Sequence, residues 1–188
     1  MTRVVNHQVD LPEAHTTSRR RLLASLLAGG AAIAATPLLA GRASAEGVVL
    51  PRDPKDFASL NDALKRERQM AATYEAAVAK ASGDDKTALN LLLDHHNAYV
   101  DAIKAYLATH AVGTTEAPLA SPTGSFKQVA AQMATLEDQT VTMHTDRLAT
   151  LVGLDAATLI ASIITMEARH GAALSLVNGA SPLAAAGA

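Results

Sequence analysis

The 188-residue sequence has no cysteine and no tryptophan, and aromatic residues make up only 3% of it. Without cysteine the chain can form no disulfide framework, no cysteine-based zinc site and no thiol nucleophile. It also lacks an excess of one charge, because 16 Lys and Arg residues accompany 18 Asp and Glu residues, for a formal net charge of −2. No basic run is longer than Arg19-Arg20-Arg21. The chain therefore lacks the electrostatic footprint of a nucleic-acid-binding protein.

Alanine is the residue that the sequence has in excess, with 41 copies. Alanine has the most favourable helix propensity, whereas β-branched runs and turn residues, which sheets require, are few. The length suggests one domain. The composition therefore predicts an all-α fold with long helices.

Residues 1–45 are interpreted as a signal peptide. A twin arginine at Arg19-Arg20 precedes a weakly apolar run over residues 22–40, and Ala43-Ser44-Ala45 follows as a small-x-small cleavage signature. This pattern resembles the signal read by the bacterial twin-arginine export machinery. The resemblance implies export of a folded protein to the periplasm, the cell envelope or the extracellular space. The alternative is a membrane anchor, but an apolar run that is rich in Ala and Gly and interrupted by Pro37 makes a poor span. We expect no stable membrane span after cleavage.

Residues 46–180 predict a bundle of four helices, and residues 181–188 predict a disordered tail. Asp53-Pro54 is a helix-start signal, because Asp caps a helix and Pro fits its first position. Apolar residues then recur about every 3.5 residues in four segments. The expected helices run from Pro54 until Ser82-Gly83, from Asp84 to His110, from near Ser125 to Gly153, and from the cap Asp155 to Asn178-Gly179.

The connections between these helices predict how they are arranged. Very short loops within the first pair and within the second pair make each pair an antiparallel hairpin. The linker between the pairs contains the breakers Gly113, Pro118, Pro122 and Gly124, and its roughly fifteen residues could extend over about 50 Å. That length allows one crossover along the bundle, as in ferritin-like folds. The second alternative is a plain up-down-up-down bundle, which needs only a short loop there.

Ionisable and hydroxyl side chains interrupt the apolar stripe of every helix, although charged residues such as Arg66 and Asp94 mostly fall outside the stripes. The interrupting residues are Glu67 in the first helix, His96 and Tyr99 in the second, Glu137 and His144 in the third, and Glu167 and His170 in the fourth. A buried carboxylate without a counter-charge costs several kcal/mol, and three at one level would raise one another's pKa. Carboxylates and imidazoles on facing helices are the ligands of divalent metals such as iron and manganese.

The spacing of these residues resembles that of a known family. Glu167-x-x-His170 lies in Met166-Glu167-Ala168-Arg169-His170, and Glu67 and Glu137 occupy corresponding places in the two hairpins. The pattern is similar to that of bacterial exported ferritin-like domain proteins over nearly all of residues 55–180. The family pattern has one Glu from each of two helices and a Glu-x-x-His from each of the other two. This chain departs from it in the second helix, where His96 and Tyr99 stand in place of Glu and His.

The resemblance implies a metal site of Glu67, His96, Glu137, Glu167 and His170, with Tyr74, Tyr99 and His144 orienting the ligands. Because the second helix lacks its carboxylate, the +4 charge of two divalent ions would meet only the −3 charge of three glutamates. A single ion held by Glu137, Glu167 and His170 is easier to balance. Two alternatives stay open at this point: a buried hydrogen-bond network left from an ancestral site, and a purely structural role for His96 beside a carboxylate.

Two functions follow from these observations. The first is an exported ferritin-like protein that binds one or two iron or manganese ions, with oxidase or peroxide-related activity as a candidate chemistry. The second is a non-enzymatic envelope stress or structural protein with a degenerate metal site. Whether the chain is an enzyme, which metal it takes, and whether it is a monomer or a homodimer stay open.

Overall fold

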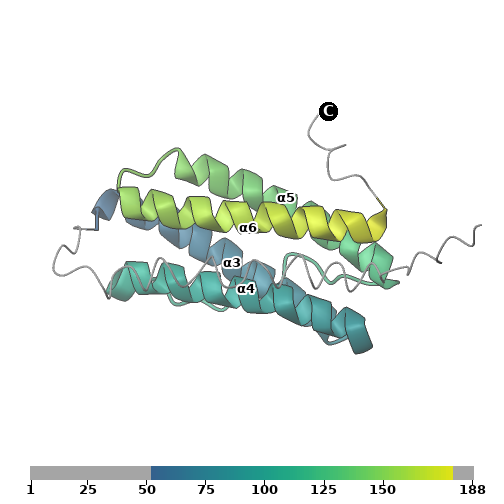
Figure 1. Cartoon of the computed structure of the whole chain (residues 1–188). Coiled ribbons are helices and arrows are strands. Elements are labelled where there is room, and N and C mark those ends of the chain that lie inside the picture. Colours follow the sequence, from purple (N-terminus) through teal and green to yellow (C-terminus); the bar gives the residue numbers. More distant parts are fainter. Residues whose placement is uncertain (1–51, 180–188) are drawn as a thin grey trace, which may run out of the picture.

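The computed structural model describes residues 52–179, in which four long helices form a bundle (Figure 1). The helices are α3 (Phe57–Val78), α4 (Gly83–Leu107), α5 (Phe126–Leu148) and α6 (Leu154–Asn178), with short 3-10 turns η1 (Pro54–Asp56) and η2 (Ala108–His110). No strand occurs in this described range, which confirms the all-α four-helix prediction. The expected signal peptide at residues 1–45 and the expected tail at residues 181–188 lie outside the described residues.

The helix boundaries follow from local hydrogen bonds that the sequence encodes. The Asp53 side chain accepts from the backbone N–H of Lys55 and starts η1. Ser125 and Gln128 form a reciprocal capping box at the start of α5. Gly179 ends α6 in the left-handed conformation with φ 79°, which glycine adopts without a steric penalty. The cap of α6 is Gly153 rather than the expected Asp155, which lies in the first turn, where a negative charge interacts favourably with the helix dipole.

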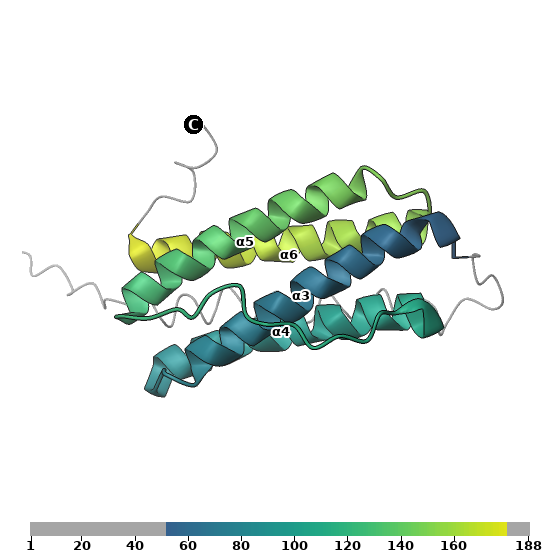
Figure 2. The ribbon, with the colours of Figure 1, turned by 180° about the vertical axis from the view of Figure 1, so that it is seen from behind.

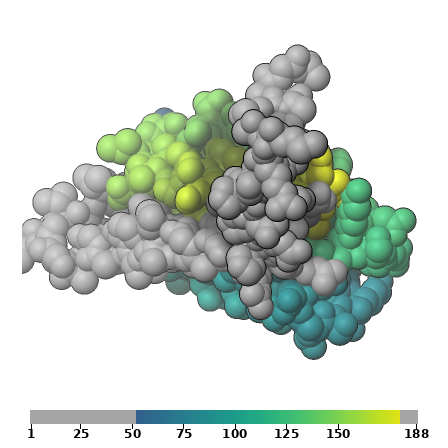
Figure 3. Space-filling view, turned by 45° about the vertical axis from the view of Figure 1, so that its right-hand side comes forward, coloured from purple at the N-terminus to yellow at the C-terminus, as the bar shows by residue number. Residues whose placement is uncertain are grey.

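The bundle consists of two antiparallel hairpins joined by a crossover. α3 packs mainly against α4, and α5 packs mainly against α6. In the ribbon the beginnings of α4 and α5 lie at the same end of the bundle (Figure 1), the end with the teal and green atoms at the right of Figure 3, so these two helices run in parallel. The linker between them returns along the length of the bundle beside α3 (Figure 2). The crossover arrangement is therefore confirmed, and the up-down-up-down alternative is wrong.

Side chains of α3 hold the crossover linker in place. Thr73 Oγ1 accepts from the backbone N–H of Leu119 at 2.9 Å, and Arg68 Nη1 donates to the Val112 carbonyl oxygen at 2.5 Å. Backbone polar groups of a connection that packs on a helix need such partners. The linker is therefore an ordered part of the bundle.

The core consists of two apolar clusters. One contains Met70, Tyr74, Leu92, Met133 and Leu174, and the other contains Leu64, Ile103, Ile160, Ile163 and Met166. A fully buried aliphatic side chain stabilises a fold by about 1.5–3 kcal/mol, so these two clusters supply most of the driving force for assembly. Between them, in each helix, lie the carboxyl and imidazole side chains that interrupt the stripes, whereas Tyr99 belongs to the second cluster. None of the helices within residues 52–179 is long and apolar enough to cross a membrane.

A buried carboxylate joins the two hairpins at one end of the bundle. Asp56, which has no exposed surface, lies directly before α3. Its Oδ1 accepts from the backbone N–H of Val152 and its Oδ2 from that of Gly153, both at 2.8 Å. The start of the first hairpin is thereby attached to the connection between α5 and α6.

Candidate metal centre

Six ionisable side chains from all four helices meet in the middle of the bundle, and none has any exposed surface. They are Glu67 of α3, His96 of α4, Glu137 and His144 of α5, and Glu167 and His170 of α6. Each stands at a position where the helical period would place an apolar residue, so helix packing brings them together. They form two groups of three, within each of which the candidate ligand atoms lie within 4.8 Å of one another.

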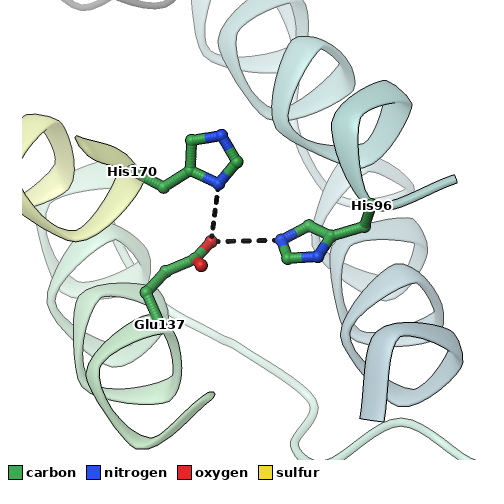
Figure 4. Close-up of side chains that lie close together, drawn as sticks. All are labelled: His96, Glu137 and His170. Carbon is green, nitrogen blue, oxygen red and sulfur yellow. Dashed lines mark hydrogen bonds and ion pairs between the residues drawn. The ribbon is translucent and has the colours of Figure 1, made fainter. Parts of the chain in front are cut away.

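The first group contains His96, Glu137 and His170 (Figure 4). Glu137 Oε1 lies 3.2 Å from His96 Nε2 and 3.4 Å from His170 Nδ1. The Tyr74 hydroxyl donates to the same oxygen. One carboxylate oxygen thus has three polar neighbours from three other helices, and the second oxygen, Oε2, has no hydrogen-bond partner in the described part of the chain.

The second group contains Glu67, His144 and Glu167. Glu67 Oε1 lies 2.5 Å from His144 Nε2, and Glu167 Oε1 lies 3.5 Å from the same nitrogen. The two groups are directly connected, because His96 Nδ1 lies 2.7 Å from Glu67 Oε2 while its Nε2 points to Glu137. His96 therefore stands between the two groups.

The position of His96 explains why two of the three glutamates ionise readily. Burial alone would raise the pKa of Glu67, but the charge of His96 and hydrogen bonds from His144 and His96 lower it well below its usual range. Burial likewise opposes ionisation of Glu137, yet His96 and His170 lower the pKa of that carboxyl to about 2. Conversely, the charges of Glu137 and Glu67 outweigh burial and raise the pKa of His96 well above its ordinary value.

The expectation that all three glutamates titrate above their usual pKa is therefore wrong for Glu67 and Glu137. In the metal-free protein His96 is a protonated imidazole between two carboxylates, and this counter-charge offsets the cost of burying them. The sequence pattern indicates which residues share the core. It does not indicate that one histidine contacts two of the carboxylates.

Glu167 differs from the other two glutamates. Burial first, and then the negative charges of Glu67 and Glu137, raise the pKa of its carboxyl well above the usual value. Neither Oε1 nor Oε2 has a hydrogen-bond partner among residues 52–179, although nearly all buried polar atoms in proteins have one. The His144 nitrogen, 3.5 Å from Oε1, lies within ion-pair distance of this carboxyl group without a hydrogen bond to it.

Two aromatic residues of α4 line the first group. The Tyr99 ring meets the His96 ring edge-on with centroids 5.8 Å apart, and its buried hydroxyl has no hydrogen-bond partner in the described range. His95 is 7% exposed, and its Nδ1 lies 2.8 Å from His170 Nε2. Burial and the nearby charges of His170 and His96 lower the pKa of His95 to about 4. His95 is therefore neutral at neutral pH.

Arg66 is not the solvated surface charge that its place beside the stripe predicts. It is half-buried, and its Nε donates to Thr140 Oγ1 at 2.8 Å. Burial lowers the pKa of the guanidinium, while the charges of Glu167, Glu67 and Glu137 favour its protonated form. Arg66 therefore adds a positive charge beside the glutamates, whereas Asp94 is exposed as expected.

The structure brings the predicted residues together but groups them differently. The expected trio of Glu137, Glu167 and His170 is divided, because Glu167 belongs to the group with Glu67 and His144. His144, which we expected to orient a ligand, has a ring nitrogen within that group. The residue that the sequence analysis missed is His95. A signal was present, since Leu92, His95 and Tyr99 follow the same i, i+3, i+7 period as the buried stripe.

Comparison with known proteins identifies the class of this fold. A family model described as a ferritin-like domain matches residues 55–180, and the chain therefore belongs to the ferritin-like domain family. The match covers all four helices and every residue of the two groups. Searches among curated proteins and among solved structures found no match.

Proposed function

We propose that this protein binds divalent metal ions, iron or manganese, in the core of its bundle. The observation that carries the proposal is Glu167, a fully buried carboxyl group with no hydrogen-bond donor to either oxygen. Three carboxylates and three imidazoles form the mixed oxygen and nitrogen donor set that these metals prefer. The arrangement of the donors also suits a metal ion, because the ligand atoms of each group of three lie within 4.8 Å of one another.

The donors of each group would hold one ion. In the first group these are His96 Nε2, Glu137 and His170 Nδ1, and in the second Glu67, Glu167 and His144 Nε2. Two ions bring +4 against the −3 of three carboxylates, so full loading requires one more anion, whereas a single ion does not. His96 would have to release its proton to become a ligand, because a protonated imidazole has no lone pair to offer.

The burial of the site limits which reactants could reach it. All six candidate ligands have no exposed surface, so only molecules small enough to pass between packed helices would reach a bound ion. Iron or manganese bound there would supply one-electron chemistry toward oxygen or peroxide. We therefore propose oxidase or peroxide-related activity, in which Tyr74 holds Glu137 in place through its hydroxyl group.

Metal analysis tests the central proposal. We expect purified protein incubated with Mn²⁺, or with Fe²⁺ under anaerobic conditions, to retain the ion after gel filtration, and Glu167→Gln to retain far less. Glu75→Gln is the matched control, because Glu75 is an exposed glutamate on α3 and the chemical substitution is the same. Equal metal content in the wild-type and Glu167→Gln proteins would overturn the proposal.

We also propose that the protein is exported by the twin-arginine route and acts in the periplasm, the cell envelope or the extracellular space. The sequence Arg19-Arg20 ahead of a weakly apolar run supports this proposal. Replacing both arginines by lysine should retain the full-length chain in the cytoplasm, as measured by cell fractionation and immunoblotting. Export of the double-lysine variant at the wild-type level would contradict it.

A second candidate function is a non-enzymatic envelope protein whose bundle no longer binds metal. The observation that favours it is Glu67, because imidazoles of the chain contact both of its oxygens, and α4 has His96 and Tyr99 where the pattern has a Glu and a His. In that case the wild-type and Glu167→Gln proteins would contain equally little metal, and neither would melt at a higher temperature when metal is added.

A further inference from the structure

His95 of α4 contacts the candidate ligand His170 of α6 on the side away from the metal donors. Its Nδ1 lies 2.8 Å from His170 Nε2, and the two rings are stacked with centroids 5.1 Å apart and planes at 16°. The other nitrogen of His170, Nδ1, lies 3.4 Å from Glu137 Oε1, and Figure 4 shows the second ring nitrogen pointing away from this carboxylate. The two nitrogens of His170 therefore have different partners.

We propose that His95 is a positioning residue that orients His170 so that Nδ1 is the metal-binding atom. This inference rests on the proposed metal-binding function. A neutral imidazole has one donor nitrogen and one acceptor nitrogen. When Nδ1 binds an ion, the proton must lie on Nε2, and His95 Nδ1 is the acceptor for it. The hydrogen bond across α4 and α6 thus selects both the tautomer and the ring orientation of the ligand.

The choice of histidine at this position follows from the charge of the core. The buried layer already contains Glu67, Glu137 and Glu167, and a carboxylate acceptor would add a fourth negative charge to the metal-free protein. A neutral imidazole accepts the same hydrogen bond without that cost. His95 also contacts His170 across the boundary between the two hairpins, since α4 and α6 belong to different hairpins.

Substitution of His95 tests the inference through metal affinity. His95→Leu removes the acceptor, and partners of metal-binding histidines affect affinity by about 10- to 100-fold. We expect His95→Leu to bind Mn²⁺ and anaerobic Fe²⁺ at least 10-fold more weakly than the wild type in chelator-competition titrations. We expect His95→Asn to retain affinity within about threefold, because its amide oxygen can accept near the position of the imidazole Nδ1. His110→Leu is the matched control, because His110 lies beyond α4 in η2 and stacks on Phe57.

Thermal melting of the metal-free proteins accompanies these titrations. A merely structural role for His95 would weaken both variants alike, because each of them removes the imidazole ring that stacks on His170. A His95→Leu protein that folds and binds metal like the wild type, or an asparagine variant as weak as the leucine variant, would overturn this inference and leave the proposed function standing. A wild-type protein that binds neither ion would overturn the proposed function, and this inference with it.

Discussion

The three buried glutamates show that residues of one type at one level of a bundle can have opposite electrostatic behaviour. Glu67 and Glu137 contact His96, whose charge lowers the pKa of both carboxyls. Glu167 has no comparable partner, so burial and its two ionised neighbours raise its pKa. In the metal-free core His96 and Glu167 are therefore both protonated, and each must release its proton before it can bind an ion.

Replacement of Glu167 by glutamine should stabilise the metal-free protein at neutral pH. A carboxyl group whose pKa is raised by folding costs stability as the pH rises above its unfolded pKa of about 4.5, because the unfolded chain ionises and the folded chain does not. Glutamine resembles the protonated acid and removes this cost. The midpoint of thermal unfolding should rise by about 4 °C for each kcal/mol gained.

The difference in stability between Glu167→Gln and the wild type should depend on pH. The midpoints of wild type and Glu167→Gln should converge as the pH falls toward 4, where glutamate is protonated in the folded and unfolded chains alike. Thermal unfolding followed by circular dichroism measures both midpoints, in the presence of a chelator and between pH 4 and pH 8. A variant that is less stable than the wild type at pH 7 would contradict the placement of Glu167 in the core.

Metal binding should release protons, because His96 and Glu167 are both protonated in the metal-free protein. The favourable contacts of His96 with Glu67 and Glu137 stabilise the metal-free fold at low pH and are lost as the pH rises through the raised pKa of His96. Metal competes with that proton, so affinity should increase with pH. Calorimetry in two buffers of different ionisation enthalpy should detect about one or two protons released per ion. Binding of equal strength at pH 6 and pH 8 without proton release would show that neither group is protonated.

At the scale of the elements, α4 carries the main departure from the family pattern. Where the family pattern has a Glu and a His, α4 has His96 and Tyr99. Helix α5 carries His144 two turns after Glu137. The His144 nitrogen lies among the oxygens of the second group, so α5 supplies an imidazole that α4 does not. The departure in α4 is therefore accompanied by a donor from α5, which packs against α3 and α6 rather than against α4.

The attachment of α3 to the α5–α6 connection should contribute strongly to stability. Asp56→Ala removes two hydrogen bonds from a fully buried carboxylate and leaves two backbone N–H groups without an acceptor. Hydrogen bonds to charged groups contribute about 1.5–3 kcal/mol each, so the loss of two should lower the free energy of unfolding by about 3–6 kcal/mol, measured by urea denaturation.

Asp62→Ala provides the comparison for this prediction. Asp62 lies in α3 and pairs with Arg147 at 2.9 Å, but both side chains are about half exposed, at 52% and 41%. Surface ion pairs contribute less than about 1 kcal/mol. A similar loss of stability in both variants would show that the Asp56 contacts do not hold the two hairpins together.

An ion bound at the proposed site should stabilise the whole molecule. All four helices contribute ligands, so an ion bound in the core would link both hairpins and bind the folded state alone. Binding to the folded state alone adds about 2.7 kcal/mol to the free energy of unfolding at a free metal concentration 100 times the dissociation constant. We expect the midpoint of thermal unfolding to rise with Mn²⁺ concentration and to return to its original value with excess chelator. An unchanged midpoint across this range would contradict a core site.

Much of the architecture could be predicted from local patterns. Asp53-Pro54, Ser125 with Gln128, and Asn178-Gly179 are boundary signals that act within a few residues of the backbone groups they satisfy. The period of the apolar residues similarly places Glu67, Glu137 and Glu167 in the core, because a helix converts spacing into a face. The first helix nevertheless ends at Val78, earlier than the expected stop at Ser82-Gly83, since a breaker marks a limit rather than the last helical residue.

The sequence by itself determined the all-α class, the four helices, a middle linker long enough for a crossover and the presence of acids and imidazoles in the core, because periodicity, capping and loop length are local properties. Only the tertiary structure decided which donors share a group, that His96 contacts two glutamates, and that His95 contacts His170. These pairings depend on the rotation and height of each helix against its neighbours. Packing of side chains from distant segments sets that register, which spacing along a single helix does not specify.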